Sequence, residues 1–155
     1  MMLDKNYCLC YAEEQDIPSW MALVRILRDY FPGLETEESL NEYKTTLLKN
    51  VLRKTALCVK NGEELVGILL FSFNSNCLSC LAVHPAHRKK GIASAMIDRM
   101  LELFSSDTDI VVTTYREGDV KGIASRQLYK KFGFREDELV NEFGYPNQKF
   151  ILHRH

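Results

Sequence analysis

The period at which apolar residues recur changes several times along the chain, and these changes divide it into elements. Apolar residues alternate or run together, as they do in strands, over residues 7–12, 56–60, 65–73, 77–83, 109–115, 134–140 and 148–153. They recur every three or four positions, as in amphipathic helices, over residues 17–31, 39–52, 92–104 and 120–132. This order predicts an α+β (mixed α/β) fold, with a sheet of six or seven strands flanked by four helices.

The connections between these elements predict how the strands pair. Asn61-Gly62 is a strong hairpin signal, and residues 74–76 turn the chain into the next strand, so three consecutive strands should form an antiparallel meander. The helix over 92–104 joins two strands as a right-handed crossover, which makes those two strands parallel. We therefore expect a mostly antiparallel sheet with one parallel pair.

Composition and charge narrow the class of protein. A chain of 155 residues predicts a single domain, residues 1–155. The net charge of −1 disfavours a nucleic-acid partner, and no apolar run approaches the ~20 residues of a membrane span. The first residues lack the apolar segment of a signal peptide. We expect a soluble, cytoplasmic protein without a nucleic-acid or membrane partner.

Five cysteines bear on the compartment and on metal binding. Their number is odd and each lies among alternating apolar residues, so we expect reduced core thiols, as in the cytosol. Cys77-x-x-Cys80 followed by His84-x-x-His87 supplies the ligand types of a zinc site. However, residues three apart on a strand face opposite sides, and the pairs are too close in sequence for a zinc finger. We therefore expect neither a metal site nor a redox pair.

The most informative stretch is residues 83–93, between the end of a strand and the start of an amphipathic helix. Backbone N–H groups are unpaired there and the helix dipole is positive, so such a turn can bind a phosphate. Gly91 allows close approach, Ala93 keeps the first turn narrow, and Arg88, Lys89 and Lys90 add positive charge. The other interpretation is a solvated basic turn that only begins a helix. Neither the Walker nor the dinucleotide-binding glycine pattern is present.

Two motifs resemble one known family. Arg88-Lys89-Lys90-Gly91-Ile92-Ala93 matches the R/Q-x-x-G-x-G/A signature of the GNAT superfamily, the acyl-CoA-dependent N-acetyltransferases. The residues before it, 81–85, look like that family's entry from strand to loop. About 35 residues downstream, 128–134 (LYKKFGF) resembles the family's L-Y-x-x-x-G-F element. The resemblance extends over essentially the whole chain.

The resemblance implies a GNAT fold and a site for acetyl-CoA as co-substrate, without a metal. In this family the amides of the signature turn hold the pyrophosphate, and the preceding strand pairs with the pantetheine through its main chain, here at Leu81 and Val83. A bulge in that strand and its divergence from the following parallel strand make room for the cofactor. The residues expected at the cofactor are Leu81, Ala82, Val83, His84, Arg88, Lys89, Lys90, Gly91, Ile92, Ala93, Ser94, Ser125 and Tyr129.

The implied reaction is direct attack of a neutral amine on acetyl-CoA, without a covalent enzyme intermediate. A main-chain N–H near Val83 would polarise the thioester carbonyl. Tyr129 matches the tyrosine that protonates the departing thiolate, although an aromatic residue that only packs on the sheet would look the same. His84, Glu117 and Ser79 are candidates for the general base, and a water chain is the alternative.

One position departs from the family pattern. Many relatives have an asparagine that contacts CoA seven residues before the helix tyrosine, where this chain has Gly122. That contact is missing here or replaced, for example by Ser125.

The sequence is compatible with several acceptor substrates and with a non-catalytic function. The family builds its acceptor pocket from the first two helices, their loop and the C-terminal strands, and these regions hold Glu35, Glu37, Glu38, Glu136, Asp137, Glu138 and Glu142. Acidic walls would suit a cationic small-molecule amine or a lysine-bearing peptide, but loop charges are often only solvated. A free amino acid, an antibiotic or a protein N-terminus would also fit the family. Dimers are common among its members, and the C-terminal strands could mediate a homodimer. A non-catalytic CoA-binding sensor or interaction module is the alternative function.

Overall fold

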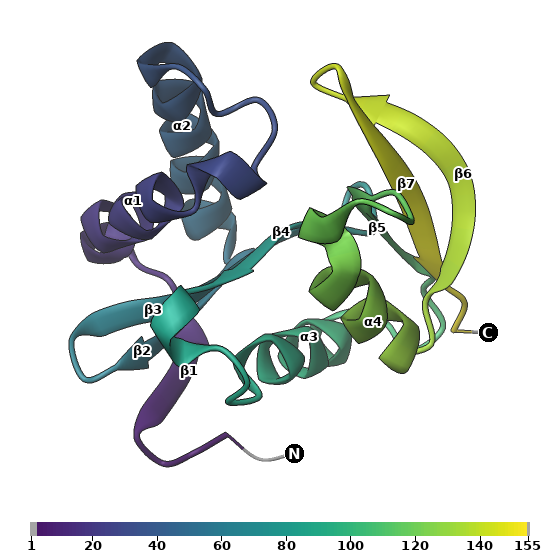
Figure 1. Ribbon diagram of the computed structural model, residues 1–155. Coiled ribbons are helices and arrows are strands. Elements are labelled where there is room, and N and C mark those ends of the chain that lie inside the picture. Colours follow the sequence, from purple (N-terminus) through teal and green to yellow (C-terminus); the bar gives the residue numbers. More distant parts are fainter. Residues whose placement is uncertain (1–2, 155) are drawn as a thin grey trace.

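The computed structural model describes residues 3–154 and contains one seven-stranded mixed sheet (Figure 1). The strand order is β1-β2-β3-β4-β5-β7-β6, and of these neighbours only β4 and β5 are parallel within the described residues. The strands are β1 (Tyr7–Tyr11), β2 (Ala56–Asn61), β3 (Glu64–Ser72), β4 (Cys77–Val83), β5 (Ile110–Tyr115), β6 (Arg135–Glu142) and β7 (Tyr145–Leu152). The predicted meander and the parallel crossover are both confirmed.

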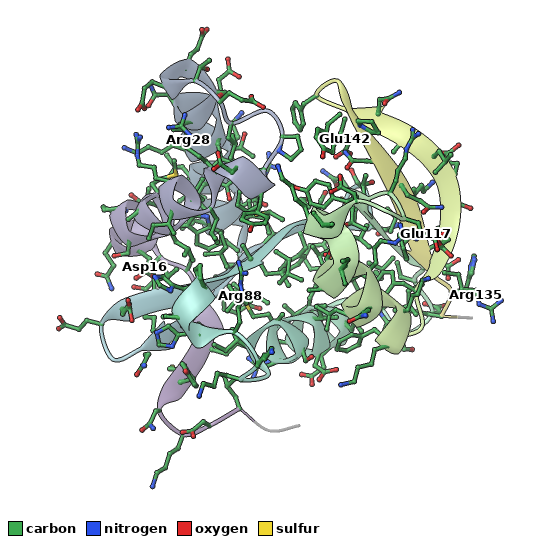
Figure 2. All side chains as sticks on the ribbon, viewed as in Figure 1. Asp16, Arg28, Arg88, Glu117, Arg135 and Glu142 are labelled. Carbon is green, nitrogen blue, oxygen red and sulfur yellow. The ribbon has the colours of Figure 1, made fainter. Side chains whose placement is uncertain are left out.

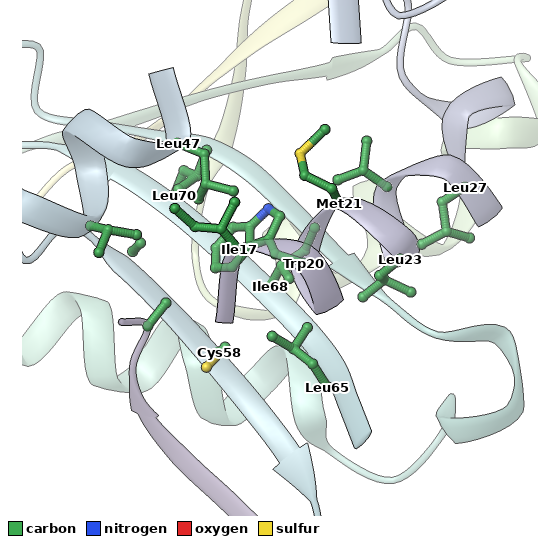
Figure 3. Packing of buried hydrophobic residues seen from close by; sticks show 14 of the residues in the cluster. Ile17, Trp20, Met21, Leu23, Leu27, Leu47, Cys58, Leu65, Ile68 and Leu70 are labelled. Atoms are coloured by element: carbon green, nitrogen blue, oxygen red, sulfur yellow. The ribbon is translucent and has the colours of Figure 1, made fainter. Parts of the chain in front are cut away.

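Four α-helices cover the two faces of the sheet over residues 3–154. They are α1 (Ile17–Ile26), α2 (Glu37–Arg53), α3 (Ile92–Leu103) and α4 (Ile123–Lys131). Successive residues of β2 and β3 alternate between the two faces, so Cys58 and Ile68 join the core under α1 and α2 (Figure 3). Val59 and Leu69 join the core under α3 and α4. No helix in the described part of the chain is both long and apolar enough to cross a membrane.

The first helix ends earlier than its apolar spacing predicts. It ends at Ile26, and the chain continues through a short 3₁₀ turn, Arg28–Tyr30. Phe31 is extended because it precedes a proline, and the Arg28 guanidinium donates to the carbonyls of Leu34 and Glu35 at 3.0 and 2.9 Å. Together these features fix a loop where the sequence predicts helix.

Other boundaries differ by two or three residues for local reasons. Helix α2 begins at Glu37 because Thr36 and Ser39 cap each other. Leu47 is fully buried in this helix, whereas the neighbouring Leu48 is 37 % exposed. Residues 120–122 form a 3₁₀ turn before α4. The hairpin β6–β7 turns at Phe143 and Gly144, which both have positive φ.

The cysteines are all free, but they are not all core residues. Only Cys58 is fully buried, while Cys8 is exposed because β1 is an edge strand with helices over only part of its faces. Cys10 Sγ lies 3.7 Å from Cys58 Sγ across the β1–β2 pair. Residues 3–154 contain no group of three or more His, Cys, Asp or Glu side chains that could hold a metal ion.

Candidate active site

The parallel strands β4 and β5 separate after a short contact. They pair only at Cys77 with Val111 and at Leu78 with Val112. On the other side of β4 the register changes, because Leu78 pairs with Phe71 and Cys80 pairs with Leu70, which leaves Ser79 as an extra residue. The bulge in β4 and its divergence from β5, both expected from the family resemblance, are therefore present.

Beyond this bulge, β4 has a free edge. The His84 N–H donates to the Val66 carbonyl at 2.8 Å, so even-numbered residues at this end of β4 pair with β3. Main-chain groups alternate between the two edges of an antiparallel strand, so those of Leu81 and Val83 face the side from which β5 has departed. The Arg88 Nε, 3.5 Å from the Val83 carbonyl, is a long contact at this edge. Apart from this contact of the Val83 carbonyl, the two residues predicted to pair with the pantetheine thus direct main-chain groups toward an edge that β5 does not cover.

The turn between β4 and α3 is shaped to expose backbone N–H groups. Lys89 and Gly91 both have left-handed backbone conformations, with φ of 62° and 78°. Helix α3 begins at Ile92, and no side chain caps its N-terminus. The first N–H groups of the helix consequently lack partners and carry the positive end of the helix dipole. This geometry matches the anion-binding turn predicted from the sequence.

A cavity of about 380 Å³ opens at this turn. One wall of the cavity is formed by α3 and the turn before it, with Lys89, Gly91, Ser94 and Asp98. The opposite wall is formed by Lys131 and Phe132 at the end of α4. Sequence reasoning missed these two, although both lie within the 128–134 motif. Two lysines and free N–H groups around one cavity favour a phosphorylated ligand.

Other residues predicted at the cofactor lie at the end of β4, in the turn that follows it and at the start of α3. Arg88, Lys89 and Lys90 are exposed, Ala82, His84, Ala93 and Ser94 are half-buried, and the Ile92 side chain is buried under the sheet. Figure 2 shows Arg88 beside the turn that precedes α3. Its guanidinium lies 5.8 Å from the centre of the Tyr30 ring. Ile92 can therefore serve a ligand only through its main chain.

His87 anchors this turn to the other end of the sheet. Its Nδ1 lies 2.9 Å from the Tyr7 hydroxyl in β1, and its Nε2 lies 3.2 Å from the Glu64 carboxylate in β3. The Tyr7 and His87 rings also pack edge to face, with centroids 5.8 Å apart. This three-residue contact holds the residue immediately before Arg88, so it fixes where the turn begins. No local sequence signal pairs residues that are 80 positions apart.

The surroundings of Tyr129 bear on the two roles considered for it, packing on the sheet and donation of a proton. Its ring packs against Phe134 and Phe150, with centroids 5.7 and 6.2 Å away. The residue is 4 % exposed, yet its hydroxyl has no hydrogen-bond partner among residues 3–154. Burial raises the pKa of the phenol, and the nearby Cys80 raises it further. The phenol therefore stays protonated at neutral pH and has a proton to donate.

The three base candidates are not brought together. Ser79 is exposed on the bulge, where its hydroxyl lies 3.4 Å from Cys77 Sγ. His84 Nδ1 accepts from the Ala86 N–H and faces a hollow of about 190 Å³ beside α1. Glu117 is exposed on the β5–α4 connection. Within the described chain, no hydrogen bond or ion pair joins any of them to Tyr129.

Gly122 and Ser125 explain the departure from the family pattern. A Cβ atom on Gly122 would lie 2.6 Å from Tyr115 Cβ, so an asparagine cannot occupy this position without displacing Tyr115. The Ser125 hydroxyl lies 2.9 Å from the Thr114 hydroxyl and 3.2 Å from the Gly122 carbonyl. Ser125 thus ties α4 to β5, and its hydroxyl is engaged with other groups of the protein.

Three loops meet where the family places its acceptor. The Tyr115 hydroxyl donates to the Tyr30 carbonyl, and Lys121 Nζ donates to the Asp29 carbonyl at 3.0 Å, which joins the β5–α4 and α1–α2 connections. The Phe143 ring in the β6–β7 turn packs on Gly33, where an added Cβ would lie 2.7 Å from the ring. These contacts close one side of the region between α2 and the β6–β7 hairpin.

Most of the acidic residues around this region already have partners. Glu37 forms a bidentate pair with Arg25, the Glu35 carboxylate accepts from the Gly33 N–H, and Glu136 pairs with Lys130 and with the buried Arg126. Asp137 and Glu138 lie within 4.0 Å of Lys149 Nζ. Glu142 lies next to the β6–β7 turn (Figure 2) and has no ion-pair partner among residues 3–154. The structure therefore favours structural roles for most of these charges.

Arg126 is the largest feature that sequence analysis missed. It is 6 % exposed and donates to the Tyr115 carbonyl and the Gln148 side chain, both at 2.9 Å. Its guanidinium also stacks on Phe150 at 4.9 Å and pairs with Glu136. One side chain thus fixes α4, and with it Tyr129, to three strands.

Comparison with known proteins identifies the family. Residues 20–134 match the model of the acetyltransferase (GNAT) family. An N-acetyltransferase from Staphylococcus aureus superposes with a TM-score of 0.74 at 15% identity, covering 94% of this chain and 100% of that one. A GNAT acetyltransferase from Bacillus cereus gives 0.71 at 19% identity, with 96% and 98% covered. The PaiA N-acetyltransferase from Thermoplasma acidophilum, solved in complex with coenzyme A, gives 0.70 at 14% identity, with 92% and 97% covered.

A curated relative is much longer than this chain. The mouse cysteine-rich protein 2-binding protein is 25% identical over 138 residues, which are 86% of this chain but only 15% of that protein. The likeness therefore concerns one segment of the relative. The fold, the signature turn and the family match agree, and the chain belongs to the GNAT acetyltransferase family.

Proposed function

We propose that the protein is a cytoplasmic N-acetyltransferase that moves the acetyl group of acetyl-CoA directly to a primary amine. One observation carries the proposal: the free edge of β4 at Leu81 and Val83 leads directly into the uncapped N-terminus of α3 and its cavity. An extended amide-containing chain ending in phosphates is complementary to that arrangement. The five free cysteines fit a reducing compartment.

Some of these residues bind acetyl-CoA, and others act on its thioester. The N–H groups from Arg88 to Ser94 bind the pyrophosphate, and the main chain of Leu81 and Val83 pairs with the pantetheine amides. The Val83 N–H is the donor that polarises the thioester carbonyl. Positioning supplies most of the acceleration because the thioester is already activated.

Tyr129 completes the reaction as a general acid. As the amine nitrogen forms its bond to the acetyl carbon, the carbon–sulfur bond breaks, and the phenol gives its proton to the departing thiolate. The amine loses one proton, which returns to the phenolate through water, so the proton count balances. A water chain fits this step better than a side-chain base, since Ser79, His84 and Glu117 have no contact with Tyr129 among the described residues.

The acceptor amine belongs to a small molecule or a peptide, and a panel assay tests this directly. The protein is incubated with acetyl-CoA and one amine at a time: a lysine-containing peptide, a peptide with a free N-terminus, spermidine, a free amino acid and an aminoglycoside. Thiol release and product mass are followed. We expect amine-dependent thiol release, and we expect Tyr129→Phe to lower kcat at least about tenfold with KM for acetyl-CoA unchanged. Tight acetyl-CoA binding without transfer to any amine would instead support the non-catalytic module.

A further inference from the structure

Tyr30 carries an exposed aromatic ring on the connection between α1 and α2. The residue is 47 % exposed and is the last of the 3₁₀ turn Arg28–Tyr30. Its carbonyl accepts from the Tyr115 hydroxyl of β5, and the carbonyl of the preceding Asp29 accepts from Lys121 Nζ at 3.0 Å. The backbone that carries the ring is thus held in place before any ligand arrives, which lowers the cost of binding one.

The side chain of Arg88 brings a cation to this ring. Its guanidinium carbon lies 5.8 Å from the ring centre, within the range of a cation–π contact. Its Nε is at the same time 3.5 Å from the Val83 carbonyl, at the edge of β4 that β5 does not cover. A cation on the Tyr30 ring is therefore next to Val83, the residue proposed to polarise the thioester carbonyl.

Arg88 is held only loosely in this position. The residue is exposed, and within residues 3–154 it forms no ion pair with a carboxylate. A pyrophosphate is a stronger partner for a guanidinium than one ring and one distant carbonyl, because both groups are charged and two parallel hydrogen bonds can form. We therefore expect acetyl-CoA, bound at the adjacent turn, to draw the Arg88 side chain away from Tyr30 and Val83.

The carboxylates of this region are less suited to bind a cation. Most of them already bind an N–H group or a basic side chain. Glu117 and Glu142 are exposed, and water weakens the attraction between an exposed carboxylate and a cation. The Tyr30 ring, in contrast, is a surface on which a cation already lies.

We propose that Tyr30 determines acceptor specificity: its ring binds the acceptor as an alkylammonium cation, and Arg88 occupies the ring until acetyl-CoA binds. This inference rests on the proposed function. The pyrophosphate takes the guanidinium, which frees the Val83 carbonyl for the pantetheine and the Tyr30 ring for the ammonium group. The ammonium group then loses one proton to water, and its nitrogen attacks the acetyl carbon. The amine therefore binds well only after acetyl-CoA, and amines that are cationic at neutral pH are preferred.

A cation that cannot be acetylated tests this site without turnover. Tetramethylammonium has no N–H bond, and quaternary ammonium ions bind to aromatic faces. In NMR titrations that follow its methyl signal, we expect the Kd to be at least about threefold lower with saturating CoA than without CoA. Tyr30→Phe, which keeps the ring, should bind this ion as the wild type does, whereas Tyr30→Leu should bind it at least about threefold more weakly. Equal affinities of the leucine variant and the wild type would overturn the proposal.

Two further variants separate the ring from a general effect of charge. Tyr11→Leu is the matched control, because Tyr11 is 42 % exposed on β1, and it should bind tetramethylammonium as the wild type does. Arg88→Gln removes the guanidinium and should lower the Kd for this ion in the absence of CoA at least about threefold. In a Tyr30→Leu background the same change should give no gain, because the ring is absent. An equal gain in both backgrounds would show that only the net charge matters, and would contradict the proposal.

Kinetics with an accepted amine keep the two proposals distinguishable. Tyr30→Leu should raise KM for that amine about three- to tenfold, with kcat at saturating amine within about twofold of the wild-type value and no rise in the Kd for acetyl-CoA. A higher Kd for acetyl-CoA would show that Tyr30 supports the cofactor site instead, and would overturn its role in acceptor binding. Ring-dependent binding of tetramethylammonium without transfer to any amine would support the cation site and overturn the proposed function. Transfer with an unchanged KM for the amine would do the reverse.

Discussion

Gly67 is a position at which α3 packs closely on the sheet. It is buried in β3, and a Cβ atom added there would lie 2.8 Å from Ile92 Cγ2 and 3.1 Å from Met96 Cε. The first distance is too short for a real contact, so either the Ile92 side chain or the helix must move. Ile92 is the first residue of α3, and any displacement there also moves the free N–H groups of the signature turn.

We predict that Gly67→Ala lowers the free energy of unfolding by about 1–3 kcal/mol, the usual effect of an extra methyl group in a packed core. It should also weaken acetyl-CoA binding about three- to tenfold, because one or two hydrogen bonds to the ligand lose their geometry. Urea unfolding and calorimetric titration measure the two effects.

Shortening Ile92 provides the internal control for this prediction. Ile92→Ala alone should destabilise the protein by about 2–5 kcal/mol through the cavity it leaves. The double variant should be less destabilised than the sum of the single changes by about 1 kcal/mol, because the added methyl group enters that cavity. Strict additivity, or a Gly67→Ala protein with wild-type stability and affinity, would refute this account of how α3 is placed.

Three further outcomes follow from single contacts. Arg126→Ala should lower the free energy of unfolding by about 2–4 kcal/mol, because it leaves buried acceptors without a donor, and an unchanged urea midpoint would count against this. His87→Ala should raise the Kd for acetyl-CoA about three- to tenfold by releasing the signature turn, with equal affinities as the contrary result. Iodoacetamide at pH 8 should alkylate the exposed Cys8 at least about tenfold faster than Cys80, because burial raises the pKa of the Cys80 thiol to about 11. Peptide mass spectrometry measures the two rates, and equal rates would contradict this prediction.

Most of the fold could be predicted because its signals are local. The change of hydrophobic period locates each strand and helix, and Asn61-Gly62 and the helix over 92–104 fix the meander and the parallel pair. The end of α1 could not be predicted from spacing, because Leu27 and Phe31 continue the apolar stripe while Arg28 holds the backbone in a loop. The exposure of Cys8 depends on which strand is at the edge, and that is a property of the whole sheet.

In the candidate site too, local features could be predicted from the sequence, whereas contacts between distant residues could not. The signature turn is contained in six consecutive residues, so glycine, positive charge and the start of a helix predict it directly. The opposite wall of the cavity, Lys131 and Phe132, depends on how α4 packs beside α3. The Tyr7–His87 contact joins residues 80 positions apart, and the contact of the Tyr43 hydroxyl with the Cys80 thiol joins residues 37 positions apart. No single-sequence pattern predicts such pairs.

Calorimetric titration with acetyl-CoA tests the central claim, that the free edge of β4 and the uncapped end of α3 form the cofactor site. We predict micromolar binding by the wild-type protein, about −8 kcal/mol. Gly91→Trp fills the cavity that Gly91 lines and should abolish binding. Gly62→Trp is the matched control, since Gly62 also has positive φ but an added Cβ meets nothing within 4 Å, and it should bind as the wild type does. No binding by the wild-type protein, or wild-type affinity in Gly91→Trp, would contradict the claim.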